Sequence, residues 1–411
     1  MHYMMRSPKS FRLHIGLFGR RNSGKSSILN ALTSQEVSIV SEIAGTTTDP
    51  VEKPMELLPL GPVLFIDTAG VDDTGALGEK RIQKTMQVFD RTELGLIISK
   101  SDEWGDFEED ILKELKDRAI PVIVVFNKCD LTPANRCQPT GFSGEKIPVV
   151  ETSALTGKGI QDLRQAILNH APDDFINRPA IVSDLVGPGE MAVLVVPIDK
   201  EAPKGRLILP QVQAIRDLLD ASSFCVVVKE RELSEVFTRF TKPPKLVVTD
   251  SQAFQKVAAD TPPEIPLTSF SILFARFQGD LQEMVKGAMT ISQLKAGDKV
   301  LVAEACSHHP IGEDIGTVKI PRWLNQYVGG QLEFVHHRGH DFPSNLSEFK
   351  LIIHCGACMW NRREMLSRIM RAKSAGVPLT NYGLTIAYSL GIFERALQPF
   401  PAALEMYRAT R

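Results

Sequence analysis

Short apolar runs alternate with amphipathic stretches along the chain, which is the pattern of an α/β protein. Residues 11–18 predict a strand, and good helix formers follow as far as Leu32. The same pattern continues with apolar strands at 63–66, 122–126 and 149–151 and a helix at 160–170. Because strands that alternate with helices favour a parallel sheet, these residues predict one domain over residues 1–172.

The same alternation resumes after a polar, proline-bearing stretch at 171–189. Apolar strands are predicted at 191–196, 224–228, 246–248, 299–303 and 349–353. They predict two smaller parallel-sheet α/β domains, over residues 178–262 and 265–411. Helices that start with proline, at 209–216 and 320–327, are 111 residues apart, and the strands at 244–248 and 349–353 are 105 apart. We therefore expect a duplicated fold, with Asp250 and Ser251 near the place where the third domain carries cysteines.

A glycine-rich loop, Gly19-Arg-Arg-Asn-Ser-Gly-Lys-Ser26, follows the first predicted strand and opens a helix. In that context the backbone N–H groups of the loop converge on phosphates. Lys25 is expected to bridge the outer phosphates and Ser26 to be a ligand of Mg²⁺. The loop residues expected to bind nucleotide are Asn22, Ser23, Gly24, Lys25, Ser26 and Ser27.

Four further motifs follow in the order typical of a GTPase. Thr46 and Thr47 have hydroxyls that sense a γ-phosphate, and Thr47 is a second expected Mg²⁺ ligand. The others are Asp67-Thr-Ala-Gly70, Asn127-Lys128-Cys-Asp130 and Ser153-Ala154. The Asp130 carboxylate accepts two guanine N–H groups that adenine lacks, which selects GTP. The predicted fold class is a P-loop GTPase domain followed by two smaller parallel-sheet α/β domains.

The first domain resembles the TrmE-like branch of small bacterial GTPases. Val71 stands where Ras-like enzymes place a water-orienting glutamine, so we expect slow unassisted GTP hydrolysis. The resemblance implies that Asp73, beside Asp72, assists instead, and that Asn22 helps to bind a stimulating K⁺ ion. The catalytic residues we predict are Lys25, Thr47 and Asp73.

Three of the six cysteines lie close to histidines, in Cys306-Ser-His308 and His354-Cys355-Gly-Ala-Cys358. Both segments follow predicted strands, and the carboxyl ends of parallel strands meet at one edge of a sheet. We therefore expect Cys306, Cys355 and Cys358 to converge on a metal. With His308 they would complete a zinc tetrahedron, whereas three thiolates alone would hold a 4Fe–4S cluster with one iron open. Spacing does not decide between these metals.

The whole chain resembles the HydF family, GTPases that mature iron-only (FeFe) hydrogenase. The resemblance rests on the cysteine motifs behind a TrmE-like domain and on Asp184-Leu, Pro203-Lys-Gly-Arg206, Thr249-Asp-Ser-Gln252 and Thr380-Asn-Tyr-Gly383. It implies that Cys306, Cys355 and Cys358 ligate a 4Fe–4S cluster, with His308 and His354 as further candidate ligands. It also implies a scaffold that receives a di-iron precursor from two radical-SAM maturases and passes it to the apo-hydrogenase. The middle domain is expected to form a homodimer through an open edge strand.

The composition of the chain limits which kinds of partner and which cellular compartment are expected. The net charge of −2 and the pI of about 6.5 give no basic excess, so no nucleic-acid partner is expected. No signal peptide or run of membrane-spanning length is present, which predicts a cytoplasmic protein without a membrane partner. Two rivals remain at this stage: a zinc-stabilised TrmE-like GTPase acting in tRNA modification or ribosome assembly, and a redox enzyme whose cluster passes electrons.

Overall fold

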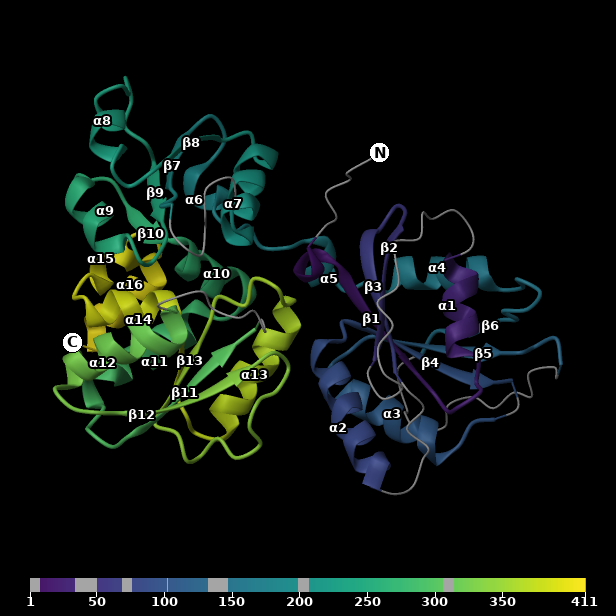
Figure 1. Cartoon of the computed structure of the whole chain (residues 1–411). Helices are drawn as coiled ribbons and strands as arrows, with labels where there is room; N and C mark the ends of the chain where they lie inside the picture. The colour runs from purple at the N-terminus through teal and green to yellow at the C-terminus, as the bar shows by residue number, and fades with distance from the viewer. Residues whose placement is uncertain are drawn as a thin grey trace. The chain divides into compact units, whose positions relative to one another are not determined.

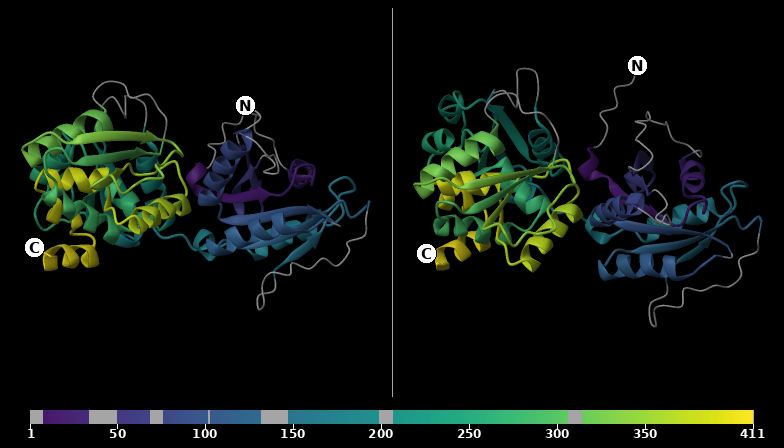
Figure 2. Two further views of the ribbon diagram at one scale, coloured as in Figure 1. Left: turned by 90° about the horizontal axis from the view of Figure 1, so that it is seen from below. Right: turned by 60° about the horizontal axis from the view of Figure 1, so that its bottom comes forward.

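The chain folds into two compact units that divide after Arg178. The computed structural model describes residues 8–33, 50–68, 76–101, 103–131, 147–198, 207–305 and 314–410. Figure 1 shows that both units consist of strands covered by helices, and Figure 2 gives two further views of them. The α/β class predicted from the alternation of apolar runs and amphipathic stretches is confirmed.

The first unit contains a six-stranded sheet in the order β2-β3-β1-β4-β5-β6. Neighbouring strands are parallel except β2 and β3, which are antiparallel. The strands are β1 (Leu13–Phe18), β2 (Val51–Leu57), β3 (Gly61–Asp67), β4 (Leu94–Lys100), β5 (Val122–Asn127) and β6 (Val149–Glu151). The helices are α1 (Lys25–Thr33), α2 (Ala76–Arg91), α3 (Asp106–Asp117), α4 (Ile160–Asn169) and α5 (Asp173–Ile176).

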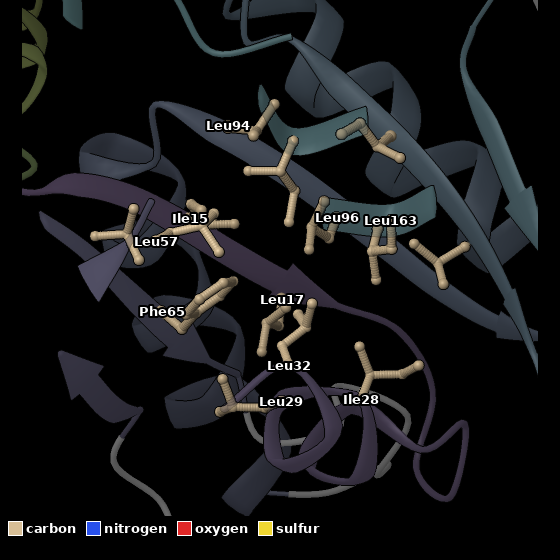
Figure 3. Packing of buried hydrophobic residues seen from close by; sticks show 14 of the residues in the cluster. Ile15, Leu17, Ile28, Leu29, Leu32, Leu57, Phe65, Leu94, Leu96 and Leu163 are labelled. Atoms are coloured by element: carbon tan, nitrogen blue, oxygen red, sulfur yellow. The ribbon is translucent and has the colours of Figure 1, made fainter. Parts of the chain in front are cut away.

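The central strands of this sheet are buried on both faces, as their continuous apolar runs predict. On one face Ile15 and Leu17 pack with Leu32 of α1 and Leu163 of α4, as Figure 3 shows. On the other face Phe18 stacks on an aromatic ring of α2, and α3 also packs there. Each of these large side chains contributes about 1.5–3 kcal/mol by leaving water. The loops at the carboxyl ends of the strands are therefore anchored on a rigid base.

The second unit contains two four-stranded sheets, in the orders β10-β9-β7-β8 and β12-β11-β13-β14. Every strand pair in both sheets is parallel. The strands are β7 (Met191–Val195), β8 (Phe224–Val228), β9 (Leu246–Thr249), β10 (Leu267–Ser269), β11 (Lys299–Glu304), β12 (Glu333–Arg338), β13 (Leu351–His354) and β14 (Leu379–Asn381). The helices are α6 (Ser183–Val186), α7 (Leu209–Asp220), α8 (Leu233–Phe237), α9 (Phe254–Asp260), α10 (Phe270–Gln278), α11 (Leu281–Met289), α12 (Ile320–Val328), α13 (Arg362–Ser374), α14 (Tyr382–Ser389), α15 (Phe393–Leu397) and α16 (Pro401–Thr410).

The two sheets repeat one topology, which confirms the predicted duplication. Read from its other edge, the second sheet runs β14-β13-β11-β12, and this matches β10-β9-β7-β8 strand for strand. Helices α7 and α12 both begin with a proline in the first turn, as the sequence pattern predicts. The last strand of the first repeat, β10, lies beyond residue 262, where the predicted middle domain ends.

Contacts between the repeats join them into one body. Arg395 of α15 donates hydrogen bonds to the carbonyl oxygens of Pro262 and Ile265, at 2.6 and 2.9 Å. Asn381 of the second repeat donates to the backbone oxygen of Ser271 in α10, at 2.8 Å. In Figure 1, α10 lies between the strands of the two sheets. The carboxyl-end loops of the two sheets are therefore held in a fixed relation to one another.

Candidate functional site

The loop between β1 and α1 adopts backbone angles that suit glycine. Gly19 has φ of 145°, and a Cβ there would lie 2.1 Å from the carbonyl oxygen of Ile98. Gly24 has φ of 96°, and a Cβ there would lie 2.2 Å from Nδ2 of Asn127. A side chain at either position is therefore both strained and blocked. The loop closes around the N-terminus of α1, as a phosphate cradle requires.

Lys25 and Ser26, the predicted phosphate and magnesium ligands, lie in the first turn of α1. The Lys25 ammonium donates to the carbonyl oxygens of Gly19 and Arg20, at 2.7 and 2.8 Å. Ser26 Oγ donates to Asp67 Oδ2 at 2.8 Å, so the two expected magnesium-binding side chains touch. Burial raises the pKa of Asp67, although Ser26 and Lys25 act in the opposite direction. Among the described residues, Asp67 Oδ1 is a buried atom without a hydrogen-bond partner, which fits a hydrated cation beside it.

Asn127 links the phosphate loop to the loop that contains Ala154. Its Nδ2 donates to the carbonyl oxygen of Ser23 at 3.0 Å, and its Oδ1 accepts from the backbone N–H of Ala154 at 3.2 Å. Asn127 and Ser153 are buried, whereas Asp130 is exposed in the turn beyond β5. The structure thus brings together the two motifs that were predicted to read the base, 127–130 and 153–154.

One contact of the phosphate loop involves a residue that lies outside all of the predicted motifs. Arg20 forms a bidentate ion pair with Glu108 of α3, at 2.9 and 3.1 Å, and its guanidinium lies over the ring of Phe107. Glu108 is fully buried. The two partners are far apart in the sequence, so spacing alone offers no signal for this pair.

Several predicted switch residues lie outside the described residues. They are Thr46, Thr47, Gly70, Val71, Asp72 and Asp73. Of the predicted potassium site, Asn22 is described, and its φ of 62° places it in the left-handed region. An asparagine accepts this conformation more readily than most residues. The left-handed backbone at position 22 therefore favours asparagine independently of any ligand of its side chain.

In the second unit, the first cysteine of the Cys-x-x-Cys motif lies at the ends of β11 and β13. These strands are parallel neighbours, and Ala303 pairs with His354. The backbone N–H of Ala305 donates to Cys355 Sγ at 3.0 Å, and the N–H of Ala357 also interacts with this thiol. Burial raises the pKa of Cys355 more than these N–H groups lower it. A bound metal would offset that cost, and N–H donors around sulfur are typical of iron–sulfur sites.

From the sequence we expect Cys358 to begin the helix that continues through residues 361–365, with Arg362 near its thiolate, but Cys358 does not begin a helix. It lies in a turn, and α13 begins at Arg362 with Asn361 as its N-cap, whose side chain accepts from the backbone N–H of Glu364 at 3.2 Å. Asparagine is among the strongest N-cap residues, so it sets the helix start. Arg362 was expected beside the thiolate, but it donates to the carbonyl oxygens of Phe277 and Gly279 at the end of α10, at 2.8 Å each.

His354 is engaged through both ring nitrogens. Nδ1 lies 2.9 Å from the carbonyl oxygen of Cys355, and Nε2 lies 3.1 Å from Nη1 of Arg368. The ring is fully buried, and burial followed by the charge of Arg368 lowers its pKa to about 3. A neutral ring that donates from Nδ1 and accepts at Nε2 has no free lone pair for a metal in this arrangement. We infer that His354 fixes the Cys355 loop.

Some of the other histidines near the cysteine motifs lie within the described residues, and some do not. Cys306, His308 and His309 lie outside the described residues. His337 pairs with Asp341 at 3.2 Å, and His340 pairs with Glu364 at 2.5 Å. Within the described stretches, no group of three His, Cys, Asp or Glu side chains is arranged to hold a metal ion. Of the three predicted cysteine ligands, Cys355 and Cys358 lie in the described stretches.

Comparisons with known families identify the domains of the chain. Residues 181–279 match the hydrogen maturase F dimerization domain, and residues 282–399 match the hydrogen maturase F tetramerization domain. The chain belongs to the hydrogen maturase F family. Residues 14–128 match the family described as 50S ribosome-binding GTPase. The resemblance seen in the cysteine motifs is therefore confirmed, and the first unit is a P-loop GTPase domain that binds GTP with Mg²⁺.

Individual relatives resemble the first unit. The tRNA modification GTPase MnmE of Chromobacterium violaceum is 37% identical over 159 residues, which is 38% of this chain and 34% of that protein. GTPase Der of Wolinella succinogenes is 33% identical, over 38% of this chain and 35% of that protein. This chain thus spans about a third of the length of these curated relatives.

Among solved structures, Aquifex aeolicus Era bound to GDP and aluminium fluoride is similar, with a TM-score of 0.33 and 20% identity, over 60% of this chain and 97% of that one. The G domain of the T. maritima FeoB iron transporter has a TM-score of 0.31 and 23% identity, over 39% of this chain and 99% of that one. Separately, none of the helices in the described stretches is long and apolar enough to span a bilayer.

Proposed function

We propose that this GTPase is a scaffold and carrier in FeFe-hydrogenase maturation. It holds a 4Fe–4S cluster through Cys306, Cys355 and Cys358, receives a di-iron precursor and passes it to the apo-hydrogenase. The partners are that apo-protein and the two radical-SAM maturases, in the cytoplasm. With three cysteine ligands one iron stays open, which gives an incoming precursor a place to bind.

The observation that carries this proposal is the hydrogen bond from the Ala305 N–H to Cys355 Sγ. Ala305 immediately precedes Cys306 in the sequence, and consecutive Cα atoms are about 3.8 Å apart. This supports the convergence of two thiolates that are 49 positions apart along the chain. The polar N–H groups at Cys355 favour a thiolate in an otherwise buried setting, as a cluster ligand requires.

The experiment is anaerobic reconstitution of the full chain with iron and sulfide, followed by iron analysis and EPR. Cys355→Ala and Cys358→Ala should each abolish the native cluster signal, and so should Cys306→Ala. Cys129→Ala and Cys225→Ala are matched controls, because both cysteines lie outside the motif. An unchanged spectrum in a motif variant removes that cysteine from the ligand set. Stoichiometric zinc in a colourless preparation would favour the alternative of a zinc-stabilised GTPase acting on tRNA or ribosomes.

GTP is proposed to control partner association rather than chemistry at the cluster. The GTP-binding motifs all lie in the first unit, and the three motif cysteines, Cys306, Cys355 and Cys358, belong to the second. Hydrolysis is proposed to be slow and stimulated by K⁺ held in part by Asn22, with Thr47 and Asp73 assisting Lys25. Pull-down of the apo-hydrogenase in the presence of GTP and of GDP tests whether the nucleotide controls this association. Equal recovery with both nucleotides would contradict the proposal.

Homodimer formation is proposed to use the edge strand β8. This strand pairs with β7 alone among the described strands, so its other edge has backbone groups open to another chain. Phe224 and Val227 on β8 are 62% and 43% exposed, so this edge strand also carries apolar side chains that face solvent. A second copy pairing along β8 would cover both the edge and these side chains.

A further inference from the structure

A groove of about 860 Å³ opens among the C-terminal helices of the second unit. Helix α11 packs against α14 and α16, and α14 packs against α12, as Figure 1 shows near the C-terminus. Tyr327 and Tyr388 line the groove one residue before the ends of α12 and α14. Met289 and Met406 line it from α11 and α16. The cysteine loop lies outside this lining, so the groove is separate from the candidate metal centre.

Four aromatic rings form a continuous run along the groove. The ring centroids of Tyr327 and Tyr388 are 5.8 Å apart, those of Tyr388 and Phe393 are 5.1 Å apart, and those of Phe393 and Tyr407 are also 5.1 Å apart. Phe393 is buried, whereas Tyr327 is 43% exposed, so the run leads from the interior to solvent. The face of an aromatic ring is negative and attracts cations. This arrangement is therefore an incomplete aromatic cage with an accessible end.

The backbone adds to the negative potential at this place. The last turns of α12 and α14 contain no basic residue, so the negative ends of these two helix dipoles are not offset by their own side chains. Among the described lining residues, Lys286 and Glu394 are charged. Each forms an ion pair, Lys286 with Glu283 at 2.5 Å and Glu394 with Arg408 at 2.6 Å. The attraction for a cation therefore comes from ring faces and helix ends.

The rest of the lining indicates the size and polarity of the ligand. A volume of about 860 Å³ is within the range of small-molecule sites. Thr290 and Ser292 donate their hydroxyl protons to helix carbonyl oxygens, at 2.7 and 2.9 Å, so their oxygens remain available as acceptors. Met289 and Met406 provide adaptable apolar contact. The groove thus suits an organic cation that also has a hydrogen-bond donor.

We propose that this groove binds a small molecule that bears an alkylated ammonium group. The cation lies against the rings of Tyr327 and Tyr388, beside the ends of α12 and α14. An alkylated ammonium fits better than a primary one, because a primary ammonium is strongly hydrated and lacks methyl groups to contact the rings. This inference goes beyond the proposed function and does not depend on the proposed cluster.

The test compares choline with 3,3-dimethylbutan-1-ol, which has the same shape but carbon in place of the charged nitrogen. Each is titrated into the full chain by isothermal calorimetry. The wild type should bind choline about tenfold more tightly or better, since the neutral compound gains nothing from ring faces or helix ends. Tyr327→Leu keeps an apolar side chain but removes a ring, and should lower choline affinity about fivefold or more. Tyr327→Phe keeps the ring and should bind choline as the wild type does.

Two outcomes overturn this inference, and neither affects the proposed function. The first is equal affinity of the wild type for the two compounds, a comparison that needs no variant. The second is a preference for choline that survives Tyr327→Leu; Tyr327 is exposed, so this variant should fold. Light scattering of Tyr327→Leu identifies the alternative occupant. If the wild type shows no preference and Tyr327→Leu forms a smaller species, the groove is a contact between copies of the chain.

Discussion

Replacing Asn127 with alanine should weaken GTP binding and loosen the phosphate loop in the nucleotide-free protein. The buried amide donates to the Ser23 carbonyl at 3.0 Å and accepts from the Ala154 N–H at 3.2 Å. Removing it leaves both backbone groups without this partner. Since each such bond contributes about 0.5–1.5 kcal/mol, we expect a loss of about 2 kcal/mol in local stability. That corresponds to a protection factor lower by about 30-fold.

Hydrogen-exchange mass spectrometry of the full chain measures this effect on peptides from β1 to α1 and from β5. Asp130→Ala is the matched control, because Asp130 is exposed and is predicted to contact only the guanine base. It should reduce GTP affinity and leave exchange in the nucleotide-free protein unchanged. If Asn127→Ala also leaves exchange unchanged, the amide does not tie the two loops, and the reasoning from these two hydrogen bonds is refuted.

GTP turnover should be faster in potassium than in sodium salts, and Asn22→Ala should remove the difference; equal wild-type rates would remove the proposed ion site. Phe224→Lys should shift the protein to a smaller species in light scattering, whereas Ile176→Lys, at an isoleucine of the first unit that is 57% exposed, should not. Burial first, and a neighbouring arginine second, lower the pKa of His14 and His354 to about 3 from the usual 6.5. Unfolded histidines take up protons below pH 6.5, so stability is full above that pH and falls below it, by about 2 kcal/mol for each histidine at pH 5. Denaturant unfolding at pH 7 and pH 5 measures this loss, and His354→Gln should reduce the pH dependence of the second unit.

Local motifs predicted the first unit well because each motif is fixed by the backbone shape that its chemistry requires. Gly19 and Gly24 lie where a Cβ would collide, so the loop shape can be read from the sequence. Apolar runs predicted the buried parallel strands, since strands covered on both faces need apolar residues throughout. The predicted duplication is seen as one topology shared by the two small sheets, and the helix starts at α7 and α12 followed from their prolines.

Contacts between distant residues were not predictable in the same way. Cys358 was placed at a helix start because a helix does follow it, but the Asn361 cap moves that start to Arg362. His354 has the spacing of a metal ligand, yet its ring is held by Arg368 of α13. A motif shows which residue types come together, whereas the direction of a side chain depends on what packs beside it in three dimensions. The ion pair of Arg20 with Glu108 was missed for the same reason.

The duplication gives a physical reason for expecting the proposed metal site in only one of two similar repeats. The loops after β9 and β13 line the same cavity of about 150 Å³, the first with Asp250 and the second with Gly356 and Cys358. Two sets of thiolates facing each other would saturate every iron and leave no position for a ligand. A carboxylate is a poorer ligand for cluster iron than a thiolate, so a wall that bears Asp250 accepts a hydrogen bond without closing the metal. In the proposed cluster, the divergence of the repeats would therefore leave one coordination position open.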